Sequence, residues 1–346
     1  AKGMLQDLDP YIKTYWPKNW AADFLPSQLN AMVLPKVGRF AIPEYLGTMA
    51  IFYNKELFTE MKIPFPKSSW TFDDMALIIE KLTVPSKRRF GALLPWDPDD
   101  RFAADLLAPF GASLVDPKDN MKCAVNTPEG LQAVTWYYNL IYTKQSVPSW
   151  NVNNWGSSNF PGLQEQDLFA TKTVAMIGEG SWMIRPIVDA VGNKFVWDLV
   201  EPPVGPVKRN TLSTTDGYGI TKKSTNPEAA WEFVDFLASP TFEKIMIDNA
   251  FLQPSRKSLI SHYINFARTS YPQLKSVNLT ALTDAMTQQF ATPEQLFKYE
   301  PQAMLAYKAV MTESLYSPKS SLTPEQIVSK LATEIDAAEQ KAATGQ

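Results

Sequence analysis

Apolar side chains recur at helical spacing in two segments of the chain. One stripe holds Phe72, Met75, Ile78, Ile79 and Leu82, and the other holds Ile327, Leu331, Ile335 and Ala338. Each stripe follows a threonine with the spacing of a capping box, Thr71 with Asp74 and Thr323 with Gln326. Both segments are therefore predicted to be amphipathic helices.

Four proline-containing strings mark further helix starts. In each, a capping side chain precedes a proline and an acid: Thr127-Pro128-Glu129, Asn226-Pro227-Glu228, Thr292-Pro293-Glu294 and Thr323-Pro324-Glu325. Proline lacks the N–H that a first helical turn leaves unused, and an acid there is favoured by the helix dipole. We expect a helix to begin at each string.

Short apolar or alternating runs between these helices have the length of strands. They are Phe40 to Ile42, Met49 to Tyr53, Phe90 to Leu94, Thr173 to Ile177, Phe195 to Val200 and Tyr218 to Thr221. Strands that alternate with helices predict an α/β architecture. Two stretches, Ser149 to Gly162 and Glu201 to Ser213, have the composition of loops. Trp150 and Trp155 in the first are either rim residues of a binding site or buried against the rest of the fold.

Composition narrows the function classes. The 346 residues predict about two domains with a sizeable core. Lys and Arg number 33 against 36 Asp and Glu, so no basic excess favours nucleic acid as a partner. No apolar run approaches the 18 or so residues that span a membrane. The chain also opens without the apolar stretch of a signal peptide, so we expect one to have been removed or the sequence to be incomplete.

The scarcity of histidine and cysteine excludes more chemistry. His262 is the only histidine, so a multi-histidine metal site is impossible, and we expect it on a surface or helix flank. Cys123 has no partner for an internal disulfide and reads as a structural residue of an edge strand. We expect no metal and no cofactor.

Eight strings occur in one order along nearly the whole chain. They are Gly38 to Pro43, Ile51 to Phe58 (IFYNKELF), Ser69 to Asp74, Thr171 to Trp182, Pro202 to Gly205, Asp216 to Lys223, Asn226 to Phe233 (NPEAAWEF) and Gln253 to Arg256. No string is specific alone, but the ordered set resembles the extracellular solute-binding proteins of bacterial ABC importers. The similarity is to the sugar-binding class that includes maltose-binding protein.

The resemblance implies a two-lobed α/β fold of the periplasmic-binding-protein type II, with a ligand in the cleft between the lobes. It divides the chain into a first lobe of 1–46 with 217–270 and a second lobe of 50–213 with 271–346. Hinge segments would lie near 45–50, near 214–219 and within 265–300. Family members usually carry strand and helix units before a segment like residues 3–12, so the first lobe is expected to be incomplete.

Trp182 is the first candidate for sugar recognition, because an aromatic face covers the apolar face of a pyranose. It follows the glycine-bearing turn Gly178 to Ser181, and the resemblance implies that the tryptophan of this segment stacks on the ligand. The alternative is a core tryptophan that packs a helix start. Trp96, Asp97 and Asp100 follow a predicted strand whose carboxyl end would face the cleft, where the acids could accept hydroxyl hydrogen bonds. Helix capping or a calcium loop are the alternatives for the two acids.

Residues of the crossing segments complete the predicted site. Tyr45, Gly47 and Thr48 lie in the first crossing, and Asp216, Gly217 and Tyr218 lie in the second. For Tyr45 and Tyr218, hinge packing is the alternative to ligand contact. Tyr307 lies in a string that resembles the segment carrying a stacking aromatic in maltose-binding protein, with chance similarity as the alternative.

The sequence thus favours a non-catalytic receptor, expected to be monomeric. It would bind a sugar outside the cytoplasm, in the periplasm or lipid-anchored, and deliver it to ABC permease subunits in the membrane. One rival is a carbohydrate-active enzyme that uses Asp97 and Asp100 as paired carboxylates. The other is a receptor for a charged solute such as a phosphorylated polyol, against which stands the scarcity of basic residues near the cleft segments, where only Arg101 and Arg185 are close.

Overall fold

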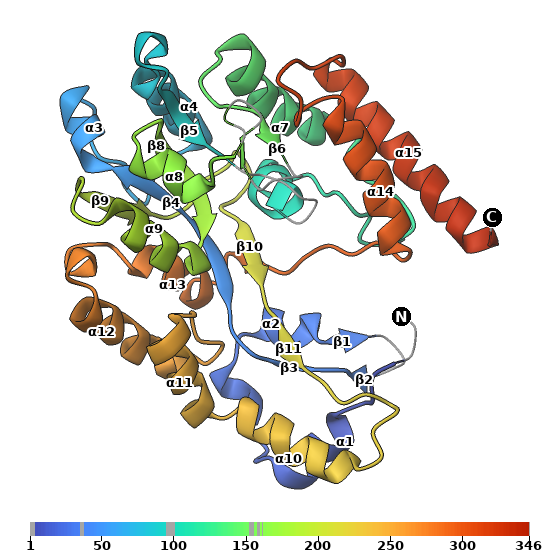
Figure 1. Ribbon diagram of the computed structural model, residues 1–346. Helices are drawn as coiled ribbons and strands as arrows, with labels where there is room; N and C mark the ends of the chain where they lie inside the picture. Colours follow the sequence, from blue (N-terminus) through green and yellow to red (C-terminus); the bar gives the residue numbers. More distant parts are fainter. Residues whose placement is uncertain are drawn as a thin grey trace.

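Two lobes of unequal size, joined by extended segments, make up the described chain (Figure 1). The computed structural model describes residues 4–34, 38–94, 101–151, 156–157, 160 and 162–345. We call the smaller lobe the part that packs around Leu8, Phe24, Ile42 and Trp231. Its elements are α1 (Asp9–Tyr15), the 3-10 helix η1 (Trp20–Asp23), α2 (Pro26–Ala31), β1 (Val33–Leu34), β2 (Gly38–Arg39), β3 (Ile42–Pro43), β11 (Gly217–Tyr218) and α10 (Pro227–Leu237).

A mixed sheet forms the centre of the larger lobe. Its strands are β4 (Gly47–Asn54), β5 (Phe90–Leu93), β8 (Val174–Gly180), β9 (Trp197–Val200), β10 (Thr211–Thr214) and β12 (Ala291–Thr292). They follow the order β12-β10-β4-β8-β5, and β9 also pairs with β4. Every residue of β4 and β8 is buried, as expected of strands covered on both faces. The α/β class predicted from the sequence is confirmed.

Helices of the larger lobe pack on this sheet or on one another. They are α3 (Lys55–Glu60), α4 (Phe72–Leu82), α6 (Ala108–Phe110), α7 (Pro128–Tyr138), α8 (Glu165–Ala170), α9 (Ile184–Val191), α11 (Pro240–Ala250), α12 (Ile260–Ser270), α13 (Thr280–Thr287), α14 (Glu300–Thr312) and α15 (Pro324–Thr344). Shorter elements are the π-helices η3 (Phe102–Leu107) and η4 (Asn139–Thr143), the 3-10 helices η2 (Pro85–Lys87), η5 (Ser181–Met183), η6 (Lys257–Leu259) and η7 (Pro272–Leu274), and the strand pair β6 (Trp150–Asn151) and β7 (Gly156–Ser157). None of the described helices is both long and apolar enough to cross a membrane.

The predicted capping residues place most helix starts correctly. Thr71 with Asp74 and Thr323 with Gln326 both form complete capping boxes. Thr127 accepts a hydrogen bond from the Gly130 amide, and Asn226 accepts one from the Ala229 amide. These four helix starts are confirmed.

The helix predicted at Thr292 is wrong. Thr292 pairs in parallel with Leu212 of β10, and its hydroxyl accepts a hydrogen bond of 2.8 Å from the Asn210 side chain. The backbone of Thr292 is therefore in a strand, and its hydroxyl is already bound by Asn210, so Thr292 does not cap a helix. The next helix, α14, begins at Glu300.

The strand predictions succeed where the runs are buried. Met49 to Tyr53, Phe90 to Leu94, Thr173 to Ile177 and Phe195 to Val200 each overlap a strand of the large sheet, whereas Phe40 to Ile42 and Tyr218 to Thr221 contribute only single residues to the β3–β11 pair. The predicted loop Glu201 to Ser213 is wrong at its end, where 211–213 belong to β10. Trp150 lies in β6, and Trp155 lies outside the described residues.

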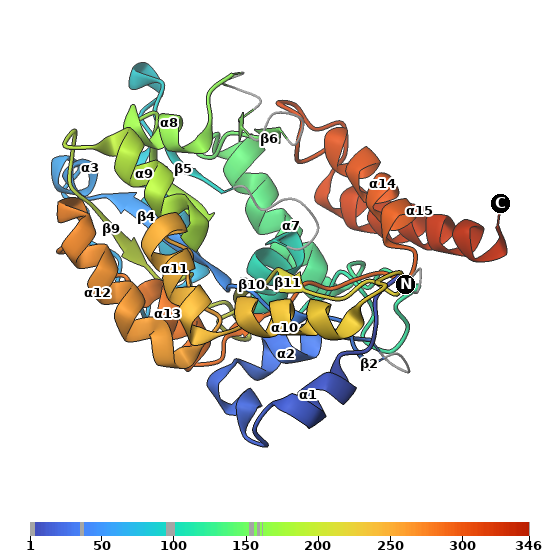
Figure 2. The ribbon, with the colours of Figure 1, turned by 60° about the horizontal axis from the view of Figure 1, so that its bottom comes forward.

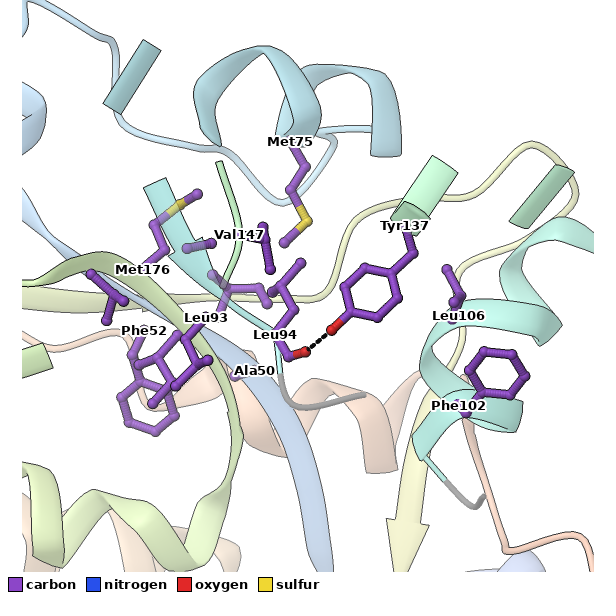
Figure 3. Close-up of a cluster of buried hydrophobic side chains, with 14 of the residues drawn as sticks. Ala50, Phe52, Met75, Leu93, Leu94, Phe102, Leu106, Tyr137, Val147 and Met176 are labelled. Atoms are coloured by element: carbon purple, nitrogen blue, oxygen red, sulfur yellow. Dashed lines mark hydrogen bonds between the residues drawn. The ribbon is translucent and has the colours of Figure 1, made fainter. Parts of the chain in front are cut away.

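The main core fills the larger lobe on both sides of the sheet. Figure 3 shows side chains from the sheet, α4 and η3 meeting there, with the Tyr137 hydroxyl donating a 2.5 Å hydrogen bond to the Leu94 carbonyl. Ile247, Phe251 and Tyr263 belong to this core although they fall in the predicted range 217–270 of the first lobe. The predicted lobe boundaries stay a prediction, and packing places α11 and α12 with the larger lobe.

The lone histidine and cysteine occupy structural positions. His262 lies on α12 with its Nε2 2.8 Å from an Asp248 carboxylate oxygen. Cys123 forms an isolated antiparallel β-bridge with Val115, and its backbone amide donates a hydrogen bond to the Asp336 carboxylate. Burial raises the pKa of the Cys123 thiol to about 12, so the reactive thiolate is scarce at neutral pH.

Candidate functional site

Two paired segments connect the lobes (Figure 1). One runs from β3 to β4 and the other from β10 to β11. Ser213 pairs with Thr48 and Thr214 pairs with Gly47, and the Glu44 amide donates a 2.8 Å hydrogen bond to the Asp216 carbonyl. The segments near 45–50 and 214–219, predicted as hinges, therefore lie side by side.

A third segment lies against the first crossing. The Leu46 amide donates a hydrogen bond of 3.0 Å to the Gln253 carbonyl, and Tyr45 forms an isolated antiparallel β-bridge with Pro254. Within the range 265–300, β12 pairs with β10, and the chain that follows β12 runs beside the second crossing as far as Leu296. The third hinge within 265–300 stays a prediction.

Trp182 lies over the start of β4 and the end of β8. An atom added at the Cβ position of Gly47 would stand 2.5 Å from the Trp182 ring, and one added at Gly180 would stand 2.3 Å from it. Both glycines therefore give the indole room to lie on the sheet. The ring also packs against a small cluster of Met49, Ala104 and Leu212, and it stays partly exposed.

A buried ion pair holds Arg101 beside this ring. The Arg101 Nη1 atom lies 2.8 Å from Oε1 of Glu179, whose side chain is fully buried, and the guanidinium carbon lies 5.5 Å from the centre of the Trp182 ring. The Gly180 amide donates to the other Glu179 oxygen at 3.0 Å. The pair thus neutralises one of the two arginines near the predicted cleft. The other, Arg185, pairs with Asp189 at 2.8 Å.

Asp105 fixes the second crossing from the π-helix η3. One of its carboxylate oxygens accepts from the Thr211 hydroxyl at 3.0 Å and from the Leu212 amide at 2.8 Å. The Asn210 side chain donates to the Ala104 carbonyl at 2.9 Å. These contacts position β10 so that the residues after it reach the space between the lobes.

A cavity of about 640 Å³ opens beside the second crossing. Three groups of residues line it: Asn30 to Val33 with Leu5, Phe40 and Ala41 of the smaller lobe; Ser213, Thr215, Asp216, Gly217 and Gly219 of the crossing; and Pro293, Glu294 and Leu296 before α14. Figure 2 shows this last segment running beside β10 and β11. The cavity is of the size that holds a small ligand.

The cavity lining has a distinct chemistry. Asp216 and Glu294 supply carboxylates, Asn30, Ser213 and Thr215 supply neutral polar groups, and no described lining residue is Lys or Arg. The Ser213 hydroxyl is buried and makes no hydrogen bond to another described residue. Such groups can accept and donate hydrogen bonds to a polyhydroxyl compound. Within the described residues, no group of three or more His, Cys, Asp and Glu could hold a metal ion.

Two tyrosines of the crossings face carboxylates. Burial, followed by the Asp216 charge, raises the pKa of Tyr45, and burial with a hydrogen bond to Glu44 raises the pKa of Tyr218. Both phenols therefore stay protonated at neutral pH. They tie the two crossings together, and their contact with a ligand stays a prediction.

The predicted site residues lie in different surroundings. Asp216 and Gly217 line the cavity, whereas Gly47 contacts Trp182 at the hinge. Thr48 and Tyr307 are fully buried. The Thr48 hydroxyl lies 2.8 Å from the Leu282 carbonyl, and the Tyr307 hydroxyl lies 3.2 Å from that of Tyr316, so neither side chain presents a surface to a ligand. Trp96, Asp97 and Asp100 lie outside the described residues.

Sequence reasoning missed several residues of the cavity. Phe40, Ser213 and Glu294 were assigned only to a strand, a loop and a helix start, and Asn30 was not singled out. Phe40 follows Gly38-Arg39 in one of the ordered strings, which is the only signal that could have marked it. The others reach the cavity through tertiary packing.

Comparisons with known proteins identify the type of protein. Residues 1–244 match the family described as bacterial extracellular solute-binding protein. A protein of Brucella abortus (strain 2308) described as a binding protein is 23% identical over 272 residues, which cover 77% of this chain and 62% of the Brucella protein. The match thus spans less than two thirds of that relative.

Solved structures share the fold. An ABC substrate-binding protein from Listeria monocytogenes in complex with cycloalternan has a TM-score of 0.77 at 22% identity, with 99% of this chain and 81% of that chain covered. UgpB from Mycobacterium tuberculosis in complex with glycerophosphocholine has a TM-score of 0.74 at 15% identity, with 99% and 80% covered. At these identities the likeness shows the two-lobed α/β fold, which confirms the predicted fold type.

Proposed function

Because the chain belongs to the family of bacterial extracellular solute-binding proteins, we propose that it binds a neutral sugar or oligosaccharide between its lobes. The solute enters while the lobes are apart, both lobes contact it, and the closed form becomes the more populated one. An ABC permease in the membrane then receives the solute. No bond is broken, and the protein works outside the cytoplasm as a monomer.

The chemistry of the 640 Å³ cavity carries this proposal. Two carboxylates, one amide and two hydroxyl side chains face it beside the ring of Phe40, with no base among its described lining residues. Carboxylates and amides bond sugar hydroxyls, and an aromatic ring covers a pyranose face. An anionic solute would meet Asp216 and Glu294, with no Lys or Arg among the described lining residues to balance its charge.

A test of this proposal must distinguish it from two alternatives, a charged ligand and an enzymatic activity. The solved relative UgpB is in complex with glycerophosphocholine, which keeps a phosphorylated polyol as the second candidate. The ion pairs of Arg101 with Glu179 and of Arg185 with Asp189 argue against it, because both arginines are already matched by an acid. The third candidate, a glycosidase with Asp97 and Asp100 as its acids, would release a product.

The experiment is a calorimetric titration with neutral maltooligosaccharides and with glycerophosphocholine, followed by product analysis of the same samples. We expect saturable binding of a neutral saccharide, which is recovered unchanged. The substitution Asp216→Asn should weaken that binding several-fold, because a charged acceptor becomes a neutral one. Preference for glycerophosphocholine, or shortened saccharides after incubation, would refute the proposal.

A further inference from the structure

A second cavity lies at the end of β8 that is farther from the crossings. It has a volume of about 840 Å³ and is bordered by η2, the start of β5, the π-helix η4 and the segment 318–320. Phe90 at its wall pairs with Val174, the first residue of β8, whereas the last residue of β8, Gly180, pairs with Met49 at the hinge. The two sites therefore lie at opposite ends of a strand about 20 Å long.

Its charge is opposite to that of the cavity of about 640 Å³ beside the second crossing, which we call the cleft cavity. Arg88, Arg89, Lys144 and Lys319 line it, and no described lining residue is acidic. Lys144 is matched by Glu80 at 3.0 Å, and Glu60 lies 3.7 Å from Arg89. Neither Arg88 nor Lys319 makes an ion pair with another described residue. In a protein with a net charge of −3, this concentration of positive charge favours an anion.

Arg89 is buried at the wall of this cavity. Its side chain is 5% exposed, its Nε atom donates to the Leu82 carbonyl at 3.2 Å, and its Nη2 atom has no hydrogen-bond partner within the described residues. The Nη2 atom has almost no accessible surface, so Arg89 contributes its positive charge to the cavity that it lines and not a direct contact through this atom.

Aromatic rings form the rest of the wall. Phe90 and Phe160 meet edge to face with ring centres 5.8 Å apart, and the rings of Tyr138 and Tyr142 are 4.7 Å apart. The Tyr142 hydroxyl lies 2.7 Å from the Ser317 carbonyl, which holds the segment 318–320 at the rim. The wall thus offers flat apolar surface next to the positive charges.

The backbone at the rim is strained in two places. Arg88 and Gln145 both adopt the left-handed conformation with φ of 51°, which is rare for residues other than glycine. Both line the cavity. Strained residues of this kind are retained where the surrounding structure has a use for them.

We propose that this cavity is a second binding site, for a small anion that carries an aromatic or other flat apolar group. The anion pairs with Arg88 and Lys319, the buried Arg89 adds positive charge behind them, and the ring of the ligand packs against Phe90 and Tyr138. This site is independent of the cleft, so the proposal does not rest on the sugar ligand.

The test titrates the full chain with the fluorescent probe 8-anilino-1-naphthalenesulfonate and compares matched variants. Arg88→Gly removes a charge from the rim and suits the left-handed backbone. Lys62→Gly is its control, because Lys62 is also exposed and left-handed, with φ of 56°, but lies outside this cavity. Lys319→Ala tests the second unpaired cation without altering a strained position.

We expect Arg88→Gly and Lys319→Ala each to raise the dissociation constant of the probe at least fivefold, and Lys62→Gly to leave it unchanged. Uncharged N-phenyl-1-naphthylamine should bind much more weakly than the sulfonate, and added sodium chloride should weaken sulfonate binding. Equal affinity in all three variants, or equal affinity for the charged and uncharged probes, would overturn the proposal. Trp182→Ala should not affect probe binding, which separates this test from that of the cleft.

Discussion

Replacing Trp182 by alanine separates ligand binding from hinge packing. The indole lies on Gly47 and Gly180, contacts the cluster of Met49, Ala104 and Leu212, and stands beside the Arg101 guanidinium. Its removal takes away an aromatic surface that the sequence predicts to stack on the ligand. It also takes away packing that the structure shows directly.

The two effects have different magnitudes. Truncating a fully buried tryptophan costs about 3–5 kcal/mol. Since Trp182 is partly exposed, we expect the free energy of unfolding to fall by about 2 kcal/mol, of which the contact with Arg101 contributes roughly 0.5–1 kcal/mol. Loss of one aromatic anchor should weaken saccharide binding by about 1–3 kcal/mol, or about 5- to 150-fold in the dissociation constant.

Calorimetry with the best neutral saccharide measures the binding effect, and urea unfolding measures the stability effect. Trp20→Ala is the matched control, because the Trp20 ring is also partly buried, with its centre 5.3 Å from the Arg39 guanidinium carbon, but it packs against the core of the smaller lobe. We expect both variants to lose stability and only Trp182→Ala to lose affinity. Unchanged affinity in Trp182→Ala would show that this residue serves the hinge alone.

Three further substitutions test the hinge and its surroundings. Gly47→Ala puts a methyl group 2.5 Å from the Trp182 ring, so the ring must move, and calorimetry should show weaker saccharide binding without loss of the folded state. Arg101→Ala leaves the Glu179 charge buried without its partner, so urea unfolding should show a loss of about 3–5 kcal/mol; a loss below 1 kcal/mol would contradict the importance of this pair. Burial raises the pKa of Glu243 to about 7, from about 4.5 in the unfolded chain. The folded state therefore holds this proton more tightly, and stability falls as the pH rises from about 5 to above 7, by up to roughly 3 kcal/mol. Glu243→Gln should flatten that part of the stability profile, and an unaltered profile would show that Glu243 is not its source.

Local signals in the sequence were enough to predict many of the helices and strands. A capping residue acts within one helical turn, so Thr71, Thr127, Asn226 and Thr323 located their helices. Thr292 carries the same signal, but its pairing with β10 decided its conformation. That pairing joins residues about 80 positions apart, which no local pattern can report.

The candidate site depends still more on contacts between distant segments. Asp216 and Gly217 were predicted from their place in a crossing segment, and both line the cleft cavity, but their contact with a ligand stays a prediction. Tyr307 looks like a ligand-stacking residue in sequence, yet it shares a face of α14 with Ala303, Val310 and Met311 and lies in the core. Its helical spacing with these apolar residues was the signal for burial.

The central claim is that a sugar bound between the lobes brings them together. Spin labels at Lys222→Cys in the smaller lobe and Lys341→Cys on α15 would report the distance between the lobes, in a Cys123→Ser background. Both lysines are exposed, so the labels should not disturb the core. Dipolar electron paramagnetic resonance should show a shift to shorter distances with saturating neutral saccharide. An unchanged distance distribution in the presence of bound saccharide would contradict the account.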